Sequence, residues 1–119
     1  MPVSLHHEGA NVYRVEVRGT LRKADLDRVQ DVLVTKMGPT GGVRLLFVLE
    51  GFGGWEPQDN WNDMSFYVKH GDSIERIAIV GDERWRGEAL MFAAADLRKG
   101  PVEFFPQPAV AEARAWLVA

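Results

Sequence analysis

Hydrophobic and polar positions alternate in the first part of the chain in a way that predicts two strands. Residues 3–9 (VSLHHEG) and 11–19 (NVYRVEVRG) are rich in β-branched side chains with partial alternation. Between them, the glycine and asparagine of the EGAN sequence suit a tight turn. We therefore expect an antiparallel hairpin at the start of the fold.

In the next segment, the spacing of hydrophobic positions changes from the alternation of a strand to the three-and-four spacing of a helix. In residues 21–38, Leu26, Val29, Leu33 and Met37 recur at spacings of three and four, and Gly38-Pro39 follows as a stop signal. This pattern predicts the first amphipathic helix. Residues 43–51 (VRLLFVLEG) are then almost uninterrupted in apolar character, which is typical of a central parallel strand buried on both faces.

The second half repeats the alternation of helix and buried strand. A helix is expected from Gln58 to His70, with Trp61, Met64 and Val68 on its buried face, Asp59 near its N-terminus and Ser65 in its middle. The remaining expected elements are a strand at 73–82, a helix at 83–100, a short strand at 102–105 and a helix at 108–117.

The expected order of elements is therefore ββαβαβαβα. Repeated β-α-β units make right-handed crossovers between parallel strands. We expect an α/β fold in which residues 1–119 form one domain, with a single, mainly parallel five-stranded sheet and an antiparallel first strand.

Ligands of such sheets favour the carboxyl ends of the strands, and two glycine-containing segments follow strands here. They are residues 51–57 (GFGGWEP) and 80–85 (VGDERW), which should share one rim of the sheet. Five aromatic side chains lie in or just after the first of them, too many for one helical face to bury: Phe52, Trp55, Trp61, Phe66 and Tyr67. Such a surface indicates an apolar ligand site, a dimer interface or membrane contact, and some of the rings could be ordinary core.

Composition and charge exclude several classes of function. The chain is 46% apolar and 26% charged, as in ordinary globular proteins. Its 14 basic and 17 acidic side chains are scattered, so we expect no nucleic-acid partner. There is no cysteine, which excludes disulfides, thiolate metal sites and cysteine nucleophiles. No leader pattern or membrane-spanning apolar run is present, so a cytoplasmic protein is expected.

The chain offers little for catalysis or for holding a cofactor. The 51–57 segment matches neither the P-loop nor the dinucleotide fingerprint, and its glycines suit a change of chain direction. Neighbouring His6 and His7 on a strand point to opposite faces, so they cannot share a metal ion. Neither Ser4 nor Ser65 lies in a G-x-S-x-G context. We expect no enzyme activity, no metal and no cofactor.

Three stretches, GFGGW, KHGDSIERIAIVGDERW and AEARAWL, together with the order of elements, resemble the SpoIIAA-like family of bacterial proteins, which are relatives of the STAS domain. The likeness covers essentially the whole chain, and residues 70–85 carry its most specific part. The resemblance implies a STAS-type fold. STAS switches carry a phosphorylatable Ser or Thr at the start of the helix after the central strand, and residues 51–64 contain neither, so such a switch is not expected.

The resemblance also implies, by analogy with CRAL-TRIO lipid-transfer domains, hydrophobic ligand binding or membrane association. We therefore expect a non-catalytic module that binds a hydrophobic small molecule or membrane lipid at the rim formed by loop 51–57 and helix 58–70. The alternative is a regulatory protein-interaction or self-association domain, most simply a homodimer, that uses the same aromatic side chains.

Overall fold

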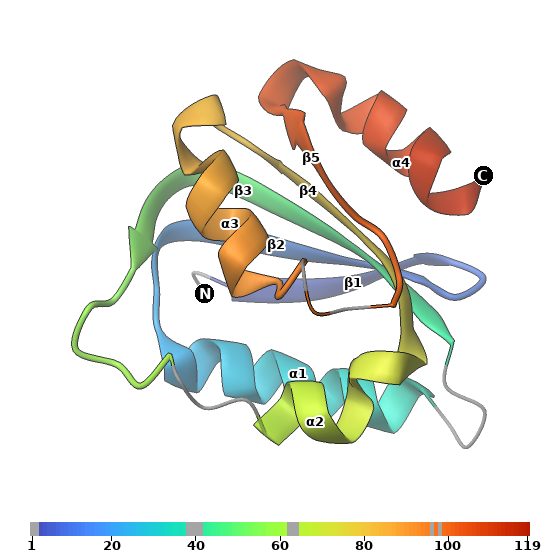
Figure 1. The fold of residues 1–119 in the computed structure, drawn as a ribbon, viewed down its shortest axis with the longest axis horizontal. Helices are drawn as coiled ribbons and strands as arrows, with labels where there is room; N and C mark the ends of the chain where they lie inside the picture. The colour runs from blue at the N-terminus through green and yellow to red at the C-terminus, as the bar shows by residue number, and fades with distance from the viewer. Residues whose placement is uncertain (1–2, 38–41, 62–64, 96, 98) are drawn as a thin grey trace.

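The computed structural model describes residues 3–37, 42–61, 65–95, 97 and 99–119 (Figure 1). Its centre is a five-stranded sheet in which the spatial order of the strands follows the chain. The strands are β1 (Val3–Gly9), β2 (Val12–Leu21), β3 (Val43–Trp55), β4 (Ile74–Gly81) and β5 (Val102–Pro106). The helices are α1 (Lys23–Met37), α2 (Ser65–His70), α3 (Arg86–Phe92) and α4 (Val110–Val118), with short 3-10 turns at Gly71–Ser73, Glu83–Trp85 and Gln107–Ala109.

The pairing of the strands confirms the predicted mixed sheet. Strand β1 pairs with β2 in antiparallel fashion, whereas the other three pairs are parallel. The hairpin turns at Ala10, whose φ of 47° is in the left-handed region. The predicted order ββαβαβαβα is therefore the observed order of strands and α-helices.

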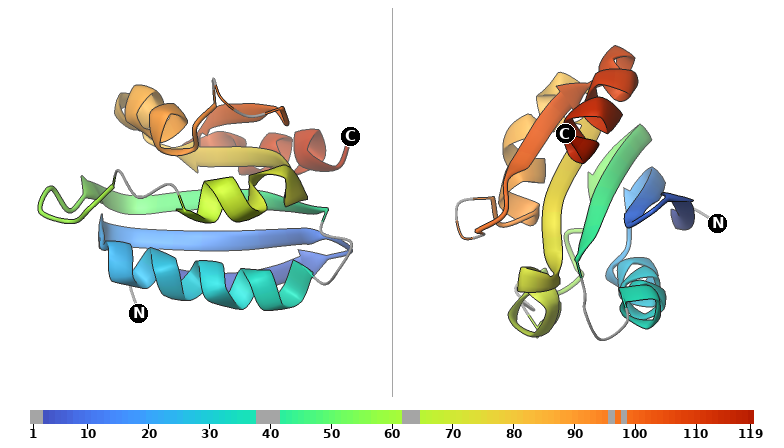
Figure 2. Two further views of the ribbon diagram at one scale, coloured as in Figure 1. Left: turned by 60° about the horizontal axis from the view of Figure 1, so that its bottom comes forward. Right: turned by 90° about the vertical axis from the view of Figure 1, so that its right-hand side faces the viewer.

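The helices lie on both faces of the sheet. Helices α1, α2 and α3 connect successive parallel strands, and because right-handed crossovers in sequential order return on one side, all three cover the same face (Figure 2). Helix α4 follows β5 and packs on the opposite face. We call these the three-helix face and the α4 face.

Each face has its own apolar core. On the three-helix face, Leu26, Val29 and Leu33 of α1 pack against sheet residues such as Leu45 and Ile77, which confirms these three positions of the predicted stripe. The side chain of Met37, the fourth position, lies outside the described residues. On the α4 face, a smaller cluster is formed by Val12, Leu46, Val48, Ala78, Val80, Ala113 and Leu117.

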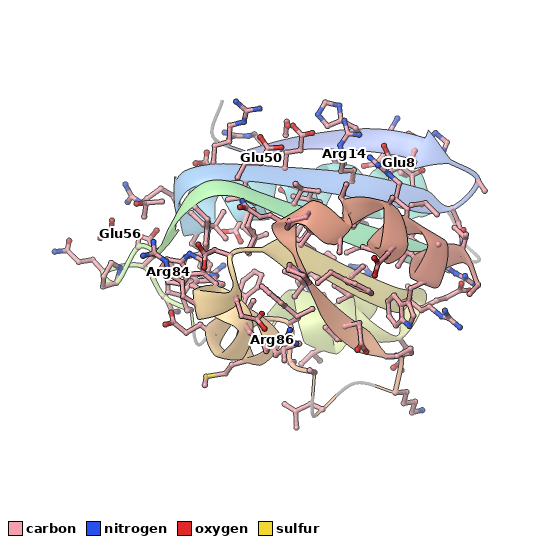
Figure 3. All side chains as sticks on the ribbon, turned by 90° about the horizontal axis from the view of Figure 1, so that it is seen from above. Glu8, Arg14, Glu50, Glu56, Arg84 and Arg86 are labelled. Carbon is pink, nitrogen blue, oxygen red and sulfur yellow. The ribbon has the colours of Figure 1, made fainter. Side chains whose placement is uncertain are left out.

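Helix α4 covers only part of its face. Figure 3 shows Glu8, Arg14 and Glu50 over the β1–β2 side of the sheet, beside α4. There Arg14 lies 2.6 Å from Glu8 and 2.9 Å from Glu16, and Arg18 lies 3.1 Å from Glu50. The pairs of Arg14 are partly buried, whereas that of Arg18 and Glu50 is exposed and contributes about 0–1 kcal/mol. This part of the sheet is therefore a surface of ion pairs.

The predicted loop at 51–57 is largely strand. Strand β3 continues to Trp55 because β2 is long enough to pair with it, with Gly19 opposite Phe52 and Leu21 opposite Trp55. The register shifts at these pairs, and Gly51 and Gly54 have φ of 53° and 94°. The glycines thus allow an irregular end of a strand, where other residues would be strained.

The predicted helix from Gln58 to His70 is also corrected, since α2 spans only Ser65–His70. Asp59 and Trp61 precede it in a turn segment, and Met64 lies outside the described residues. Val68 was expected to be buried but is 76% exposed. Ser65 is the first residue of α2, where a position in mid-helix was expected.

The helix expected at 83–100 is shorter as well. A 3-10 turn occupies Glu83–Trp85, and α3 ends at Phe92. Ala94 has a φ of 55°, and the backbone N–H groups of Ala94 and Ala95 donate to the carbonyls of Met91 and Leu90. These bonds form a Schellman-type C-cap, which ends a helix. The glycine that normally signals such a cap is absent, so sequence reasoning extended the helix too far.

Candidate functional site

A cavity of about 540 Å³ lies between the three-helix face of the sheet and helices α1, α2 and α3. Its floor is formed by apolar side chains of β2, β3 and β4: Val15, Leu45, Phe47, Ile77 and Ile79. Pockets for small molecules typically have volumes of roughly 300–1,000 Å³ and mostly apolar walls. The cavity therefore has the size and the lining of a ligand site.

Aromatic rings gather at one end of the cavity around Phe92, the last residue of α3. Its ring centroid lies 5.4 Å from Trp55, 6.0 Å from Trp61 and 6.3 Å from Phe47, and all four rings line the cavity. We call these four residues the aromatic end. Tilted and edge-to-face contacts at such distances are favourable because the positive edge of one ring meets the negative face of another.

A second layer of rings supports the aromatic end from behind. Phe52 lies 4.9 Å from Trp55 and 5.2 Å from Trp85, measured between ring centroids. Trp85 lies 6.1 Å from Trp55, and its ring covers the Cα of Gly54, where an added Cβ would meet it at 3.1 Å. The segments 51–57 and 80–85 thus meet at one rim, as predicted from the ends of their strands.

The lip of the cavity is polar and comes from two helices. Lys23, Asp27 and Gln30 lie at spacings of four and three on α1, and Glu88 lies in the first turn of α3. The Lys23 Nζ is 2.7 Å from the Asp27 carboxylate, so these two charges neutralise each other. The apolar interior and this polar lip together suit an amphipathic molecule.

Asp59 ties the segment that carries Trp61 to the start of α1. Its carboxylate accepts hydrogen bonds from Arg22 Nε at 3.0 Å, from Arg22 Nη2 at 3.3 Å and from the backbone N–H of Lys23 at 2.9 Å. The hydrogen bond from Arg22 and then that from Lys23 lower the pKa of Asp59, and the same contact raises the pKa of Arg22. Asp59 was expected at the N-terminus of the following helix, but it caps α1.

Trp61 is held by the same segment. Its Nε1 donates to the carbonyl oxygen of Glu56 at 2.7 Å, which leaves the ring against Phe92. Trp55 differs, because its Nε1 is covered by neighbouring atoms and has no hydrogen-bond acceptor among the described residues. Trp55 therefore presents an apolar ring to the cavity.

The structure brings together three of the five predicted site residues. Trp55, Trp61 and Phe66 line the cavity. Phe52 does not line it but is buried in the core behind the aromatic end, against Trp55 and Trp85. The side chain of Tyr67 lies outside the described residues.

Sequence reasoning missed the other walls of the cavity. Phe47 was expected only as part of the buried strand at 43–51, and the sequence analysis singled out neither Phe92 nor the polar positions of α1 as site residues. The spacing of Lys23, Asp27 and Gln30, which runs alongside the buried stripe of α1, was a signal that could have indicated the lip.

Two further features follow from the described part of the chain. No group of three or more His, Asp or Glu side chains is arranged there to hold a metal ion. Among the described helices, none has the length and apolar character needed to span a membrane.

Comparison with known proteins places the chain in context. The model of the family described as SpoIIAA-like matches residues 12–118. A similar solved structure is that of an uncharacterized protein from the DUF3478 family with a SpoIIAA-like fold, from Shewanella loihica PV-4. The two share 19% sequence identity and superpose with a TM-score of 0.74 over 97% of this chain and 91% of that one. No curated protein matches the sequence.

Proposed function

The chain belongs to the SpoIIAA-like family, and from this and the geometry of its cavity we propose that it is a non-catalytic domain that binds a hydrophobic small molecule or the chain of a lipid. The observation that carries the proposal is the cavity of about 540 Å³ with its aromatic end and polar lip. A core without a ligand role is normally close-packed, with few voids larger than a water molecule. A cavity of this size under three helices therefore favours the binding of a ligand.

Helix α2 is the part of the wall best suited to open. It has only six residues, and of its described side chains only Phe66 lines the cavity, whereas Val68 and Lys69 are exposed. Short helices depend on tertiary packing for their stability, and among the described side chains of α2 only Phe66 packs against the core of the three-helix face. We propose that α2 acts as a lid through which the ligand enters.

The test of binding uses a variant that fills the cavity. Ala93 lines the cavity and is 5% exposed, so Ala93→Phe places a ring inside it, with Ala93→Leu as a milder version. The matched control is Ala111→Phe on the exposed side of α4, across the sheet. An organic extract of each freshly purified protein is examined by mass spectrometry, and each protein is titrated with the neutral fluorescent probe N-phenyl-1-naphthylamine.

We expect saturable probe binding, near one site per chain, in the wild type and in Ala111→Phe, with a loss of at least tenfold in affinity for a folded Ala93 variant. A stoichiometric apolar compound in the wild-type extract would identify the ligand class. No saturable binding together with an empty extract, or unchanged binding in folded Ala93→Phe, would refute the proposal.

A second candidate function is association through exposed apolar side chains of the helices that border the cavity. Val68 of α2 is 76% exposed, and Met91 of α3, which also lines the cavity, is 80% exposed. Exposed apolar side chains that gather in a patch mark interaction surfaces. They would serve a homodimer or contact with a membrane surface. Analytical sedimentation compares the oligomeric state of the wild type with that of the double variant Val68→Asp, Met91→Gln. If the chain associates through these side chains, the wild type sediments as a dimer and the double variant as a monomer.

A further inference from the structure

The two ends of the cavity differ in chemistry. Lys23 and Glu88 of the polar lip lie with the aromatic end near the carboxyl rim of the sheet: Asp59 binds the backbone of Lys23 and precedes Trp61, and Glu88 follows Trp85, whose ring contacts Trp55. The opposite end is lined by Leu33 of α1 and by Ile74, the first residue of β4. From Lys23 to Leu33, α1 rises about 15 Å. The lining therefore suits an elongated molecule with one polar end.

The charges at the lip select the sign of that polar end. Of its four polar side chains, Lys23 and Asp27 are paired with each other at 2.7 Å and Gln30 is neutral. The carboxylate of Glu88 has no hydrogen-bond or ion-pair partner among the described residues. Among the described residues of the lip, Glu88 thus carries a negative charge with no ion-pair partner, which opposes an anionic group and attracts a cation.

The aromatic end points to the same sign. Trp55, Trp61 and Phe92 line one end of the cavity. The ring centroids of Trp55 and Trp61 lie 5.4 and 6.0 Å from that of Phe92. A ring attracts a cation placed over its face, with tryptophan the strongest of the aromatic side chains, and sets of such rings recognise quaternary ammonium groups. The carboxylate of Glu88, which lines the same cavity, adds to this attraction.

We infer that the ligand is a single-chain amphipath with an alkylated ammonium head. The head lies between the aromatic end and Glu88, and the hydrocarbon chain runs along α1 toward Leu33. This inference rests on the proposed function, since it names the class of ligand that the cavity takes.

The experiment compares three probes with the same chain and different heads: dodecyltrimethylammonium, dodecanol and dodecanoate, each below the concentration at which it aggregates. Binding to the full chain is measured by calorimetry and by the change in tryptophan fluorescence. Two variants remove one negative charge each: Glu88→Gln at the lip and Glu112→Gln on α4, on the other face of the sheet. Trp61→Leu removes a ring but keeps the wall apolar.

We expect the ammonium probe to bind roughly tenfold more tightly than dodecanol and dodecanoate to bind most weakly. Glu88→Gln and Trp61→Leu should each weaken the ammonium probe about three- to tenfold and change dodecanol by less than twofold. Glu112→Gln should leave all three affinities unchanged. That result would show that the effect of Glu88→Gln does not come from a general attraction between a cation and an acidic protein.

The outcomes separate this inference from the proposed function. Equal binding of the three probes, tighter binding of dodecanoate, or equal effects of Glu88→Gln and Glu112→Gln would overturn the ammonium head while leaving chain binding intact. If none of the three probes binds with saturation, the proposed function fails and the inference fails with it.

Discussion

Phe92 should be the side chain that most stabilises the aromatic end. Its ring contacts Trp55, Trp61 and Phe47, with centroid distances of 5.4, 6.0 and 6.3 Å. Aromatic pairs contribute about 0.5–1.5 kcal/mol each beyond the area they bury. Phe92→Leu removes all three contacts but keeps most of the apolar burial. Because the three pairs share one ring, we expect a loss of about 2 kcal/mol in the free energy of unfolding and not the full sum.

The matched control is Phe105→Leu, on the α4 face. Phe105 is also partly buried, but among the described residues it has one aromatic neighbour, Trp116, at 5.9 Å. The same substitution there should cost about 1 kcal/mol. Comparison of the two variants therefore isolates the extra aromatic contacts from the generic cost of replacing a phenylalanine.

The assay is urea unfolding followed by circular dichroism, which does not depend on the tryptophans. For a slope of about 2 kcal/mol per molar urea, the midpoint of Phe92→Leu should fall by about 1 M, and that of Phe105→Leu by about half as much, with both slopes unchanged. If Phe105→Leu costs as much as Phe92→Leu, the aromatic end does not contribute to stability as reasoned.

Three further predictions concern pH, packing and dynamics. Hydrogen bonds from Arg22 and Lys23 lower the pKa of Asp59 below its ordinary value of 3.8, so its contribution to stability is complete above that pH and is lost as the pH falls through the lower folded value. Urea midpoints of the wild type between pH 2.5 and 7 should therefore fall more at the acid end than those of Asp59→Asn, and parallel curves would contradict the assignment. A Cβ on Gly100 would overlap the carbonyl oxygen of Glu75, whereas one on Gly87 of α3 meets nothing within 4 Å. Thermal unfolding should accordingly show that Gly100→Ala is destabilised by more than about 2 kcal/mol and that Gly87→Ala is stabilised by about 0.5–1 kcal/mol. If Gly87→Ala proved less stable than Gly100→Ala, the close packing at Gly100 would be rejected. Amides of α2 should exchange with solvent at least tenfold faster than those of β4, and equal protection would exclude the lid.

Much of the architecture could be predicted from the sequence because it depends on periodicity. The stripe of Leu26, Val29 and Leu33 and the continuous apolar runs of β3 and β4 indicate which residues face the core. The order of helices and strands then restricts the sheet, since crossovers between parallel strands are right-handed. The positions of Trp55 and Trp85 on one rim followed from the same rule, without knowledge of any contact.

The ends of the elements were less predictable because partners distant in the sequence decide them. Strand β3 extends through Gly51 and Gly54 because β2 offers a pairing edge. Helix α3 stops two residues before Ala94, which adopts a left-handed conformation without the usual glycine. In each case the residues at the boundary gave only a weak indication of where the element ends. Pairing with a neighbouring strand, or a C-cap, decided the boundary instead.

By itself, the sequence determined the α/β class, the order of helices and strands along the chain and the grouping of aromatic residues near one rim. Only the tertiary structure decided that α1, α2 and α3 leave a space over the sheet, and that Phe92 and the polar lip border it. The physical reason is that a pattern reports which face of an element is apolar, whereas a cavity depends on the distance between two such faces. That distance is set by packing, by side-chain size and by ties such as that of Asp59 to the start of α1.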